Sequence, residues 1–373
     1  MRPSIETIAS RVRSQKQLLP ALYKDMDFDT PPERFSTRAG DDTELRFGAR
    51  LTREELLADT DMVARFREYT MLGDVTGDAY AALMPRYGFR PLVDMLVTAC
   101  EKGIGAVPDA PPELGALIAE MERTPDWLNM TLVEQGAREE RNSAANLAPF
   151  AIRGAFIATF LNKYSALPMA LTGTLSHATA ARRVKETATF FTTTILPGAL
   201  ERYGSGFQAA AMVRLMHSMV RVNVLSRPGM WDAKTYGMPI PQLDQMPAGL
   251  IPIYFLSNDV LKAGRTEFTP AERARVELAR YRCYLLGLPE DLLGIRLKIS
   301  FASGARAVRR CAMTMTTQFA AACCVPLWRP NCRRINRLRA VYFAGWNVLS
   351  RASFLPRRFW EGTCNARQNW GFP

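Results

Sequence analysis

The chain has 373 residues, of which 48% are hydrophobic, so it is long and apolar enough to build a sizeable core. Its formal net charge is +12, but residues 301–373 hold 12 arginines against one acid, Glu361, and the rest of the chain is nearly neutral. No RNP run, zinc-finger spacing or basic region leading into heptads accompanies this charge. We therefore expect no nucleic-acid partner.

Residues 1–50 are polar and contain a Pro-Pro pair, which predicts a partly ordered lead-in with one short helix near Ile8 to Tyr23. No apolar block follows the first charges, so we expect neither a secretory signal nor an anchor. The seven cysteines include no CxxC pair, which suits free thiols in a reducing compartment. We expect a cytoplasmic or membrane-surface location and not secretion.

Residues 51–300 have a helical pattern. Segments such as REELLADTDMVARFREYTML and PPELGALIAEMERT repeat apolar residues three and four apart, and strand-like alternation is scarce. Gly and Pro separate these segments at ordinary loop lengths. The pattern predicts an all-α fold, as one large helical domain over 51–300.

Residues 301–373 differ in composition, with no lysine, no aspartate and five of the seven cysteines. We treat them as an Arg/Cys-rich C-terminal extension of uncertain role. The uncharged stretch from Cys311 to Trp328 is nearly long enough to span a bilayer, but it contains Gln318 and three threonines. This favours a buried or interfacial helix over a membrane span and leaves peripheral membrane attachment open.

The chain has only two histidines, His177 and His217. Di-iron bundles need Glu-x-x-His pairs and metalloproteases need HExxH, and neither motif occurs. No Cys/His cluster has zinc spacing, and the absence of CxxCH excludes covalent haem attachment. A haem that needs one axial ligand from the protein is still compatible with this sequence.

His217 lies in the predicted helix AAAMVRLMHSMVRVNVL, in an apolar stripe. Its imidazole needs a partner, and a haem iron is one such partner. Arg214 and Arg221, three before and four after it, share an adjacent stripe from which they could reach haem propionates. A hydrogen-bonded core histidine is the alternative, and spacing alone does not decide between the two.

The helix before this one carries Arg183, Glu186 and Thr187 on one face, which Phe190 and Phe191 continue. A carboxylate, a hydroxyl and a guanidinium beside aromatic rings could form a polar corner in an apolar pocket. The alternative is an ordinary Arg-Glu pair on a solvated face.

Four elements in this order carry a family resemblance: ARRVKETATFF, then GxGFxxAxxVRLMHSMVR, WDxxxYGMPIPQ and YLLGLPEDLL. Together they resemble the catalytic domain shared by rubber oxygenase (latex clearing protein) and the MpaB oxygenases. The upstream segments VPDAPPEL and TPDWLNMTLVEQGAR are also similar to larger members. The resemblance covers roughly residues 65 to 295.

The resemblance implies that His217 is the proximal ligand of a haem b iron. On the distal side, Arg183 and Thr187 match the RxxKT arrangement of the rubber-cleaving branch, but Glu186 replaces its lysine, and Lys185 is one residue away, about 100° around the helix. We hypothesise that Glu186, desolvated near apolar rings with a raised pKa, acts as a base there.

The implied function is a haem-dependent oxygenase that uses O2 to oxidise a C=C bond of a hydrophobic, isoprenoid-like substrate, on a helical domain with a globin-like haem-binding core. Two alternatives stay open. One is a non-catalytic haem or O2 binder. The other is a haem-free interaction protein whose basic tail binds a membrane surface or a partner.

Overall fold

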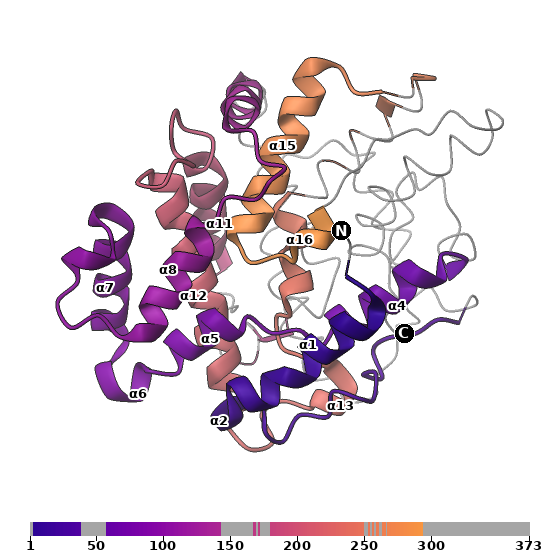
Figure 1. The fold of residues 1–373 in the computed structure, drawn as a ribbon, viewed down its shortest axis with the longest axis vertical. Helices are drawn as coiled ribbons and strands as arrows, with labels where there is room; N and C mark the ends of the chain where they lie inside the picture. The colour runs from indigo at the N-terminus through magenta and orange to yellow at the C-terminus, as the bar shows by residue number, and fades with distance from the viewer. Residues whose placement is uncertain are drawn as a thin grey trace, which may run out of the picture.

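The computed structural model describes residues 3–38, 57–142, 180–249 and 263–293 except 266, with a few single positions between these ranges. Side chains of residues 180–184 and 246–248 are not part of that description. The regular elements in these ranges are α-helices and short 3-10 helices, without a strand among the described residues (Figure 1). The prediction of an all-α fold is confirmed.

The N-terminal residues form two helices, α1 (Ile5–Leu18) and α2 (Pro20–Tyr23), because the proline that opens α2 cannot continue α1. Gln15 is fully buried, and its amide donates to the carbonyl of Met71 at 3.0 Å and accepts from the N–H of Gly73 at 2.8 Å. Residues 3–38 therefore contribute buried side chains to the core, and they form two helices in the region for which the sequence predicted one short helix. Their apolar side chains in the core are those of Ile8, Val12, Tyr23, Met26 and Phe28.

Aspartates begin two of the next helices. The side chain of Asp59 accepts from the N–H of Met62 at the start of α4, and that of Asp74 accepts from the N–H of Gly77 at the start of α5. The helices of this part are α4 (Thr60–Tyr69), α5 (Val75–Ala81), α6 (Met84–Tyr87), α7 (Phe89–Lys102), η1 (Ile104–Ala106) and α8 (Pro112–Glu122), followed by helical residues 130–142.

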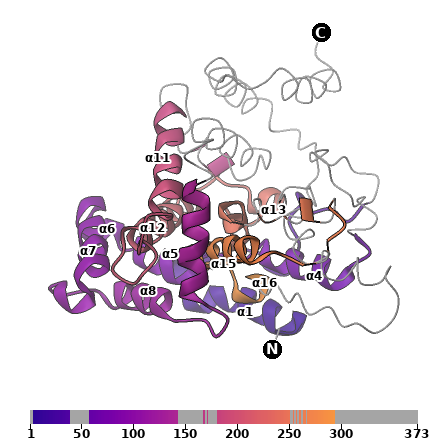
Figure 2. The ribbon, with the colours of Figure 1, turned by 90° about the horizontal axis from the view of Figure 1, so that it is seen from above.

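The long helix α12 (Ser205–Leu225) lies at the centre of the described part (Figures 1 and 2). It packs against α5, α7 and the preceding helix α11 (Ala180–Thr193). Small residues let it run close to its neighbours, since Gly206, Ala210 and Ala211 are all buried. The helix can therefore bring side chains from its middle into contact with several elements at once.

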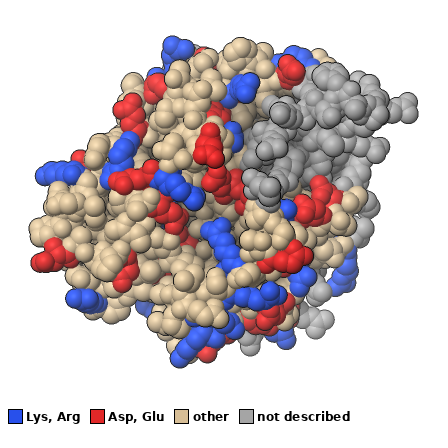
Figure 3. Space-filling view, in the orientation of Figure 1, with Lys and Arg blue, Asp and Glu red and all other residues tan. Residues whose placement is uncertain are grey.

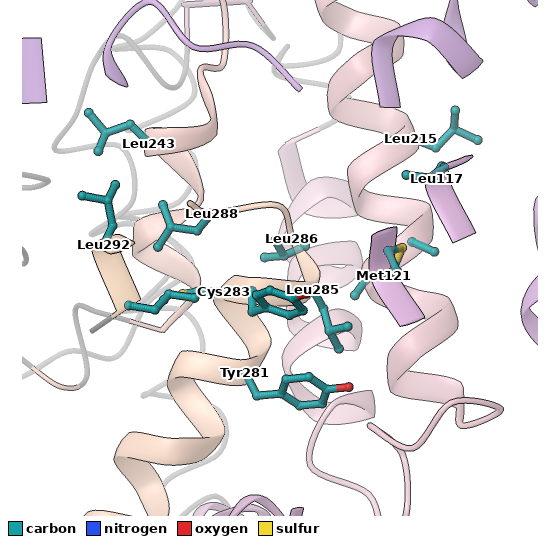
Figure 4. Packing of buried hydrophobic residues seen from close by; sticks show 14 of the residues in the cluster. Leu117, Met121, Leu215, Leu243, Tyr281, Cys283, Leu285, Leu286, Leu288 and Leu292 are labelled. Atoms are coloured by element: carbon teal, nitrogen blue, oxygen red, sulfur yellow. The ribbon is translucent and has the colours of Figure 1, made fainter. Parts of the chain in front are cut away.

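The described C-terminal elements are α13 (Ala233–Tyr236), η2 (Gln242–Ala248), α15 (Pro270–Leu285) and α16 (Glu290–Leu293). The core helix α15 begins at a capping box in which Thr269 and Glu272 each bond the other's backbone N–H. It also packs against α12 and η2. Figure 4 shows part of the shared core, where Leu215 of α12, Leu243 of η2 and Leu285 of α15 are among the buried side chains.

Basic and acidic side chains are intermixed over the described surface in Figure 3. No helix within the described ranges combines the length and apolarity needed to cross a bilayer. The stretch from Cys311 to Trp328, and the whole of 301–373, lie outside the described residues.

Candidate functional site

One face of α12 carries a buried polar stripe of Arg214, Ser218 and Arg221. It faces α5, which presents Asp74 and Asp78 one helical turn apart, and both carboxylates are buried. Two arginines and two aspartates thus meet inside an otherwise apolar interface. A buried charge needs such a partner to offset its loss of hydration.

Arg214 binds Asp74 in a two-point contact, with Nε 2.5 Å from Oδ2 and Nη2 2.8 Å from Oδ1. Its Nη2 also donates to Glu120 on α8. This planar fork-to-fork geometry is the strong form of the ion pair. Burial alone would raise the pKa of Asp74, but the charge of Arg214 outweighs it and holds that pKa below its ordinary value.

Arg221 places Nε 2.8 Å from both carboxylate oxygens of Asp78. Its Nη1 donates to the backbone carbonyls of Pro239 and Ile240. The hydroxyl of Tyr23 donates to Asp78 from the other side. Burial raises the pKa of Asp78 in spite of the charge of Arg221. The cluster joins α2, α5, α12 and the segment before η2.

These contacts revise the interpretation of the two arginines. Arg214 and Arg221 were expected to reach haem propionates, but the structure engages both guanidinium groups with carboxylates of α5 and α8. Both side chains are also fully buried within the protein. We therefore assign them to holding α12 in place against α5 and α8.

His217 lies on a neighbouring stripe of the same helix. Val213, Met216 and Val220 share that stripe and are, like His217, partly buried, while Ala210 and Val224 at its edge are fully buried. The apolar surroundings expected from the sequence are present among the described side chains.

The imidazole of His217 is held by a glutamine from another element. Its Nδ1 lies 3.1 Å from Oε1 of Gln245, a buried residue of η2. A carbonyl oxygen only accepts, so Nδ1 donates in this contact, and when the ring is neutral its lone pair is on Nε2. A metal-ligating histidine usually has this arrangement, with one nitrogen bonded to an acceptor and the other toward the metal.

The three residues expected on the distal side all lie on α11. The side chain of Arg183 is outside the described part, Thr187 is half-buried and Glu186 is exposed. The expectation that Glu186 is desolvated is therefore wrong for this structure. The aromatic rings are one turn further on, where Phe190 and Phe191 pack edge to face at 5.3 Å between centroids. Helix α11 packs against α12, so it borders the helix that carries His217.

The donor chemistry fits a haem held by a single imidazole. Among the described residues, no group of three His, Cys, Asp or Glu side chains could hold a metal ion by itself. A haem does not need such a group, because the porphyrin supplies four nitrogens and the protein a fifth ligand. His217, partly buried on an apolar stripe with its Nδ1 bonded, has the properties of that ligand.

Asp74, Asp78, Glu120 and Gln245 were not found from the sequence. The aspartates carry a weak signal, since LGDVTGDAY places two acids four apart, about one helical turn, in an apolar context. Gln245 has no comparable signal, because nothing in its neighbourhood singles it out from Gln242.

The fold and the site define an α-helical protein with an imidazole as its candidate cofactor ligand. Residues 144–362 match the family model described as ER-bound oxygenase mpaB/B′/rubber oxygenase, catalytic domain. The chain belongs to this oxygenase family. The match includes α11, α12 and α15, and it runs well into the segment expected to be a C-terminal extension.

Among solved structures, the chain is similar to the latex clearing protein in its closed state, with 15% identity and a TM-score of 0.49 over 77% of this chain and 85% of that one. A comparison with curated proteins gives no significant match.

Proposed function

We propose that the protein is a haem-b-dependent oxygenase that uses O2 to oxidise a C=C bond of a hydrophobic, isoprenoid-like substrate. The observation that carries this proposal is the His217–Gln245 contact, inside the part of the chain that matches the oxygenase family. The catalytic unit in this proposal includes the helical body over 51–300, and the Arg/Cys-rich C-terminal extension over 301–373 is assigned no role in it.

His217 would hold the haem through Nε2, and the haem would supply the binding and activation of O2. The partly buried apolar residues on the stripe of His217, such as Val213 and Val220, would limit the access of water to that side of the ring. This suits an apolar substrate, and an apolar substrate in turn suits a protein that is attached to a membrane surface.

We assign Arg183, Glu186 and Thr187 of α11 to the distal side of the site, because Arg183 and Thr187 match the family motif and Glu186 takes the place of its lysine. Glu186 then moves a proton, and its exposure lets its carboxyl group exchange protons with bulk water. Thr187, which is half-buried, would donate or accept a hydrogen bond on that side. Arg183 supplies a permanent positive charge.

The absorption spectrum tests the proposal directly. Purified protein supplied with haem should show a Soret band, and His217→Gly should lose it. Added imidazole should restore the band in this variant if only the ligand has been removed. His177→Gly is the matched control and should keep the band, since His177 is the other histidine of the chain.

Oxygen uptake then separates an enzyme from a carrier. The haem-loaded protein should consume O2 with unsaturated isoprenoids and not with their saturated analogues. Haem binding without uptake on any unsaturated substrate would favour a non-catalytic O2 binder. A correctly folded protein that takes up no haem would overturn the proposal.

A further inference from the structure

We infer that Gln245 is a positioning residue that fixes the tautomer and ring orientation of His217, and that Arg221 holds the turn from which Gln245 acts. The consequence for the haem rests on the proposed function. The tautomer of His217 is a property of the protein alone and can be determined without a cofactor.

The contact has a defined direction. Oε1 of Gln245 lies 3.1 Å from Nδ1 of His217, within hydrogen-bonding distance. Because the carbonyl oxygen of an amide has no proton to give, the ring donates through Nδ1–H. In water a neutral histidine favours the proton on Nε2, so Gln245 selects the less common tautomer and leaves the lone pair on Nε2.

Gln245 is buried and held from two sides. Its backbone carbonyl accepts from the thiol of Cys283 on α15 at 3.7 Å. At the start of the same 3-10 helix, the N–H of Gln242 donates to the carbonyl of Leu72 at 2.8 Å. Because the backbone of Gln245 is already fixed, the residue loses little conformational entropy when its side chain binds His217.

Arg221 fixes the turn before this helix. Its guanidinium binds the carbonyls of Pro239 and Ile240 while it is itself bound by Asp78. Ile240 has a φ of 46°, a conformation that a β-branched residue rarely adopts. Such strain persists only where the surroundings impose it, and the bonds from Arg221 provide that constraint.

Helix α12 therefore carries both His217 and the arginine that holds the segment leading to Gln245. Arg221 lies one turn beyond His217 on α12, and it orients the segment that returns Gln245 to His217.

The tautomer can be measured in the protein without haem. With ¹⁵N-labelled histidine only two imidazoles contribute signals, and His177→Gln assigns them. At a pH where both rings are neutral, His217 should carry its proton on Nδ1. Gln245→Leu should move that proton to Nε2, and Gln245→Glu, which keeps an acceptor, should restore it to Nδ1.

Gln208→Leu is the control. It removes another glutamine bond on α12, the one from Gln208 to Glu101, at a distance from His217. It should leave the His217 signals unchanged. If Gln245→Leu does not fold, Gln245→Glu and Gln245→Met, measured beside the unaltered protein, decide the outcome. A His217 tautomer that is the same with and without an acceptor at position 245 would overturn the inference.

In the ferrous haem-loaded protein the iron–histidine stretching frequency gives a second readout. Gln245→Leu should lower it and Gln245→Glu should raise it, because an acceptor on Nδ1 makes Nε2 a stronger donor. Haem affinity should fall on the order of 10-fold in Gln245→Leu. Loss of haem binding in the unaltered protein would reject the proposed function and leave the tautomer result standing. Haem bound by His217, with frequency and affinity unchanged in the variants, would reject the role of Gln245 alone.

Discussion

Arg221 of α12 and Asp78 of α5 form an ion pair in which both side chains are fully buried, with Nε 2.8 Å from each carboxylate oxygen. The two residues are 143 positions apart in the sequence. Asp78 precedes the family match, which begins at residue 144, and Arg221 lies within it. The early helices therefore complete the interior of the family domain and are not an appendage to it.

Removal of one partner of this pair should be costly. Arg221→Met leaves Asp78 buried without its countercharge and releases the carbonyls of Pro239 and Ile240. We expect a loss of about 3–5 kcal/mol in the free energy of unfolding, the usual cost of breaking a buried pair from one side. Urea unfolding followed by circular dichroism measures this loss.

The matched control is Arg13→Met. Arg13 pairs with Asp29 at 2.6 Å, but both side chains are largely exposed, so their attraction is weakened by water. This variant should unfold at nearly the same urea concentration as the unaltered protein. Equal losses in the two variants would mean that burial does not set the strength of these pairs.

The close approach of α5 to α12 depends on Gly77. A Cβ at this position would lie 2.6 Å from Oγ of Ser218 and 2.8 Å from Oδ2 of Asp74, and Asp74 cannot turn away without breaking its bond to Arg214. We expect Gly77→Ala to cost about 1–3 kcal/mol, although alanine is the better helix former. Thermal unfolding should show the lower stability.

Gly115 provides the control for this substitution. It lies within α8, and a Cβ there would meet no atom within 4 Å. Gly115→Ala should stabilise the protein by up to about 1 kcal/mol, because only helix propensity changes. A gain at both positions would show that α5 and α12 are less tightly packed than described.

Acid should weaken the start of α15. The hydrogen bond from Arg265 lowers the pKa of Glu272 to about 2, from an ordinary value of 4.5. The unfolded chain therefore binds a proton at Glu272 more readily than the folded protein does. The stability that Glu272 contributes is complete above pH 4.5 and is lost as the pH falls toward 2.

The difference in unfolding free energy between the unaltered protein and Glu272→Gln isolates this contribution. It should be constant at neutral pH and shrink across the acid range. Thr269→Ser keeps the capping hydroxyl and should retain the acid dependence, since the Arg265–Glu272 pair is intact. A difference that does not vary with pH would remove Glu272 from the acid response.

The helical fold was predictable because apolar residues recur three and four apart over most of the described helices. The role of the N-terminal helices could not be predicted in this way. Polar residues such as Gln15 indicate a loosely held segment by composition, yet Gln15 is buried because the backbone at Met71 and Gly73 offers it partners. Such partners lie more than 50 positions away and have no local pattern.

The same limit applies to the site. His217 could be singled out because the chain has only two histidines. Arg214 and Arg221 were placed correctly on the helix, but their partners could not be inferred. An arginine binds the carboxylate of a haem propionate and that of an aspartate with the same geometry. Only the packing of α5 against α12 decides between the two.

The exposure of Glu186 leads to a last prediction, which bears on catalysis. Glu186→Gln removes the proton-carrying group and keeps the size of the side chain, so haem binding should be unchanged while turnover falls. General acid or base groups typically contribute about 10²- to 10⁴-fold to a rate, which sets the expected range of the loss. Lys185→Gln changes the neighbouring exposed residue and should leave turnover near its original value. Oxygen uptake under saturating substrate compares the two variants at equal haem content. If both variants turn over as fast as the unaltered protein, Glu186 carries no proton in the reaction, and the proton must come from water or from another group.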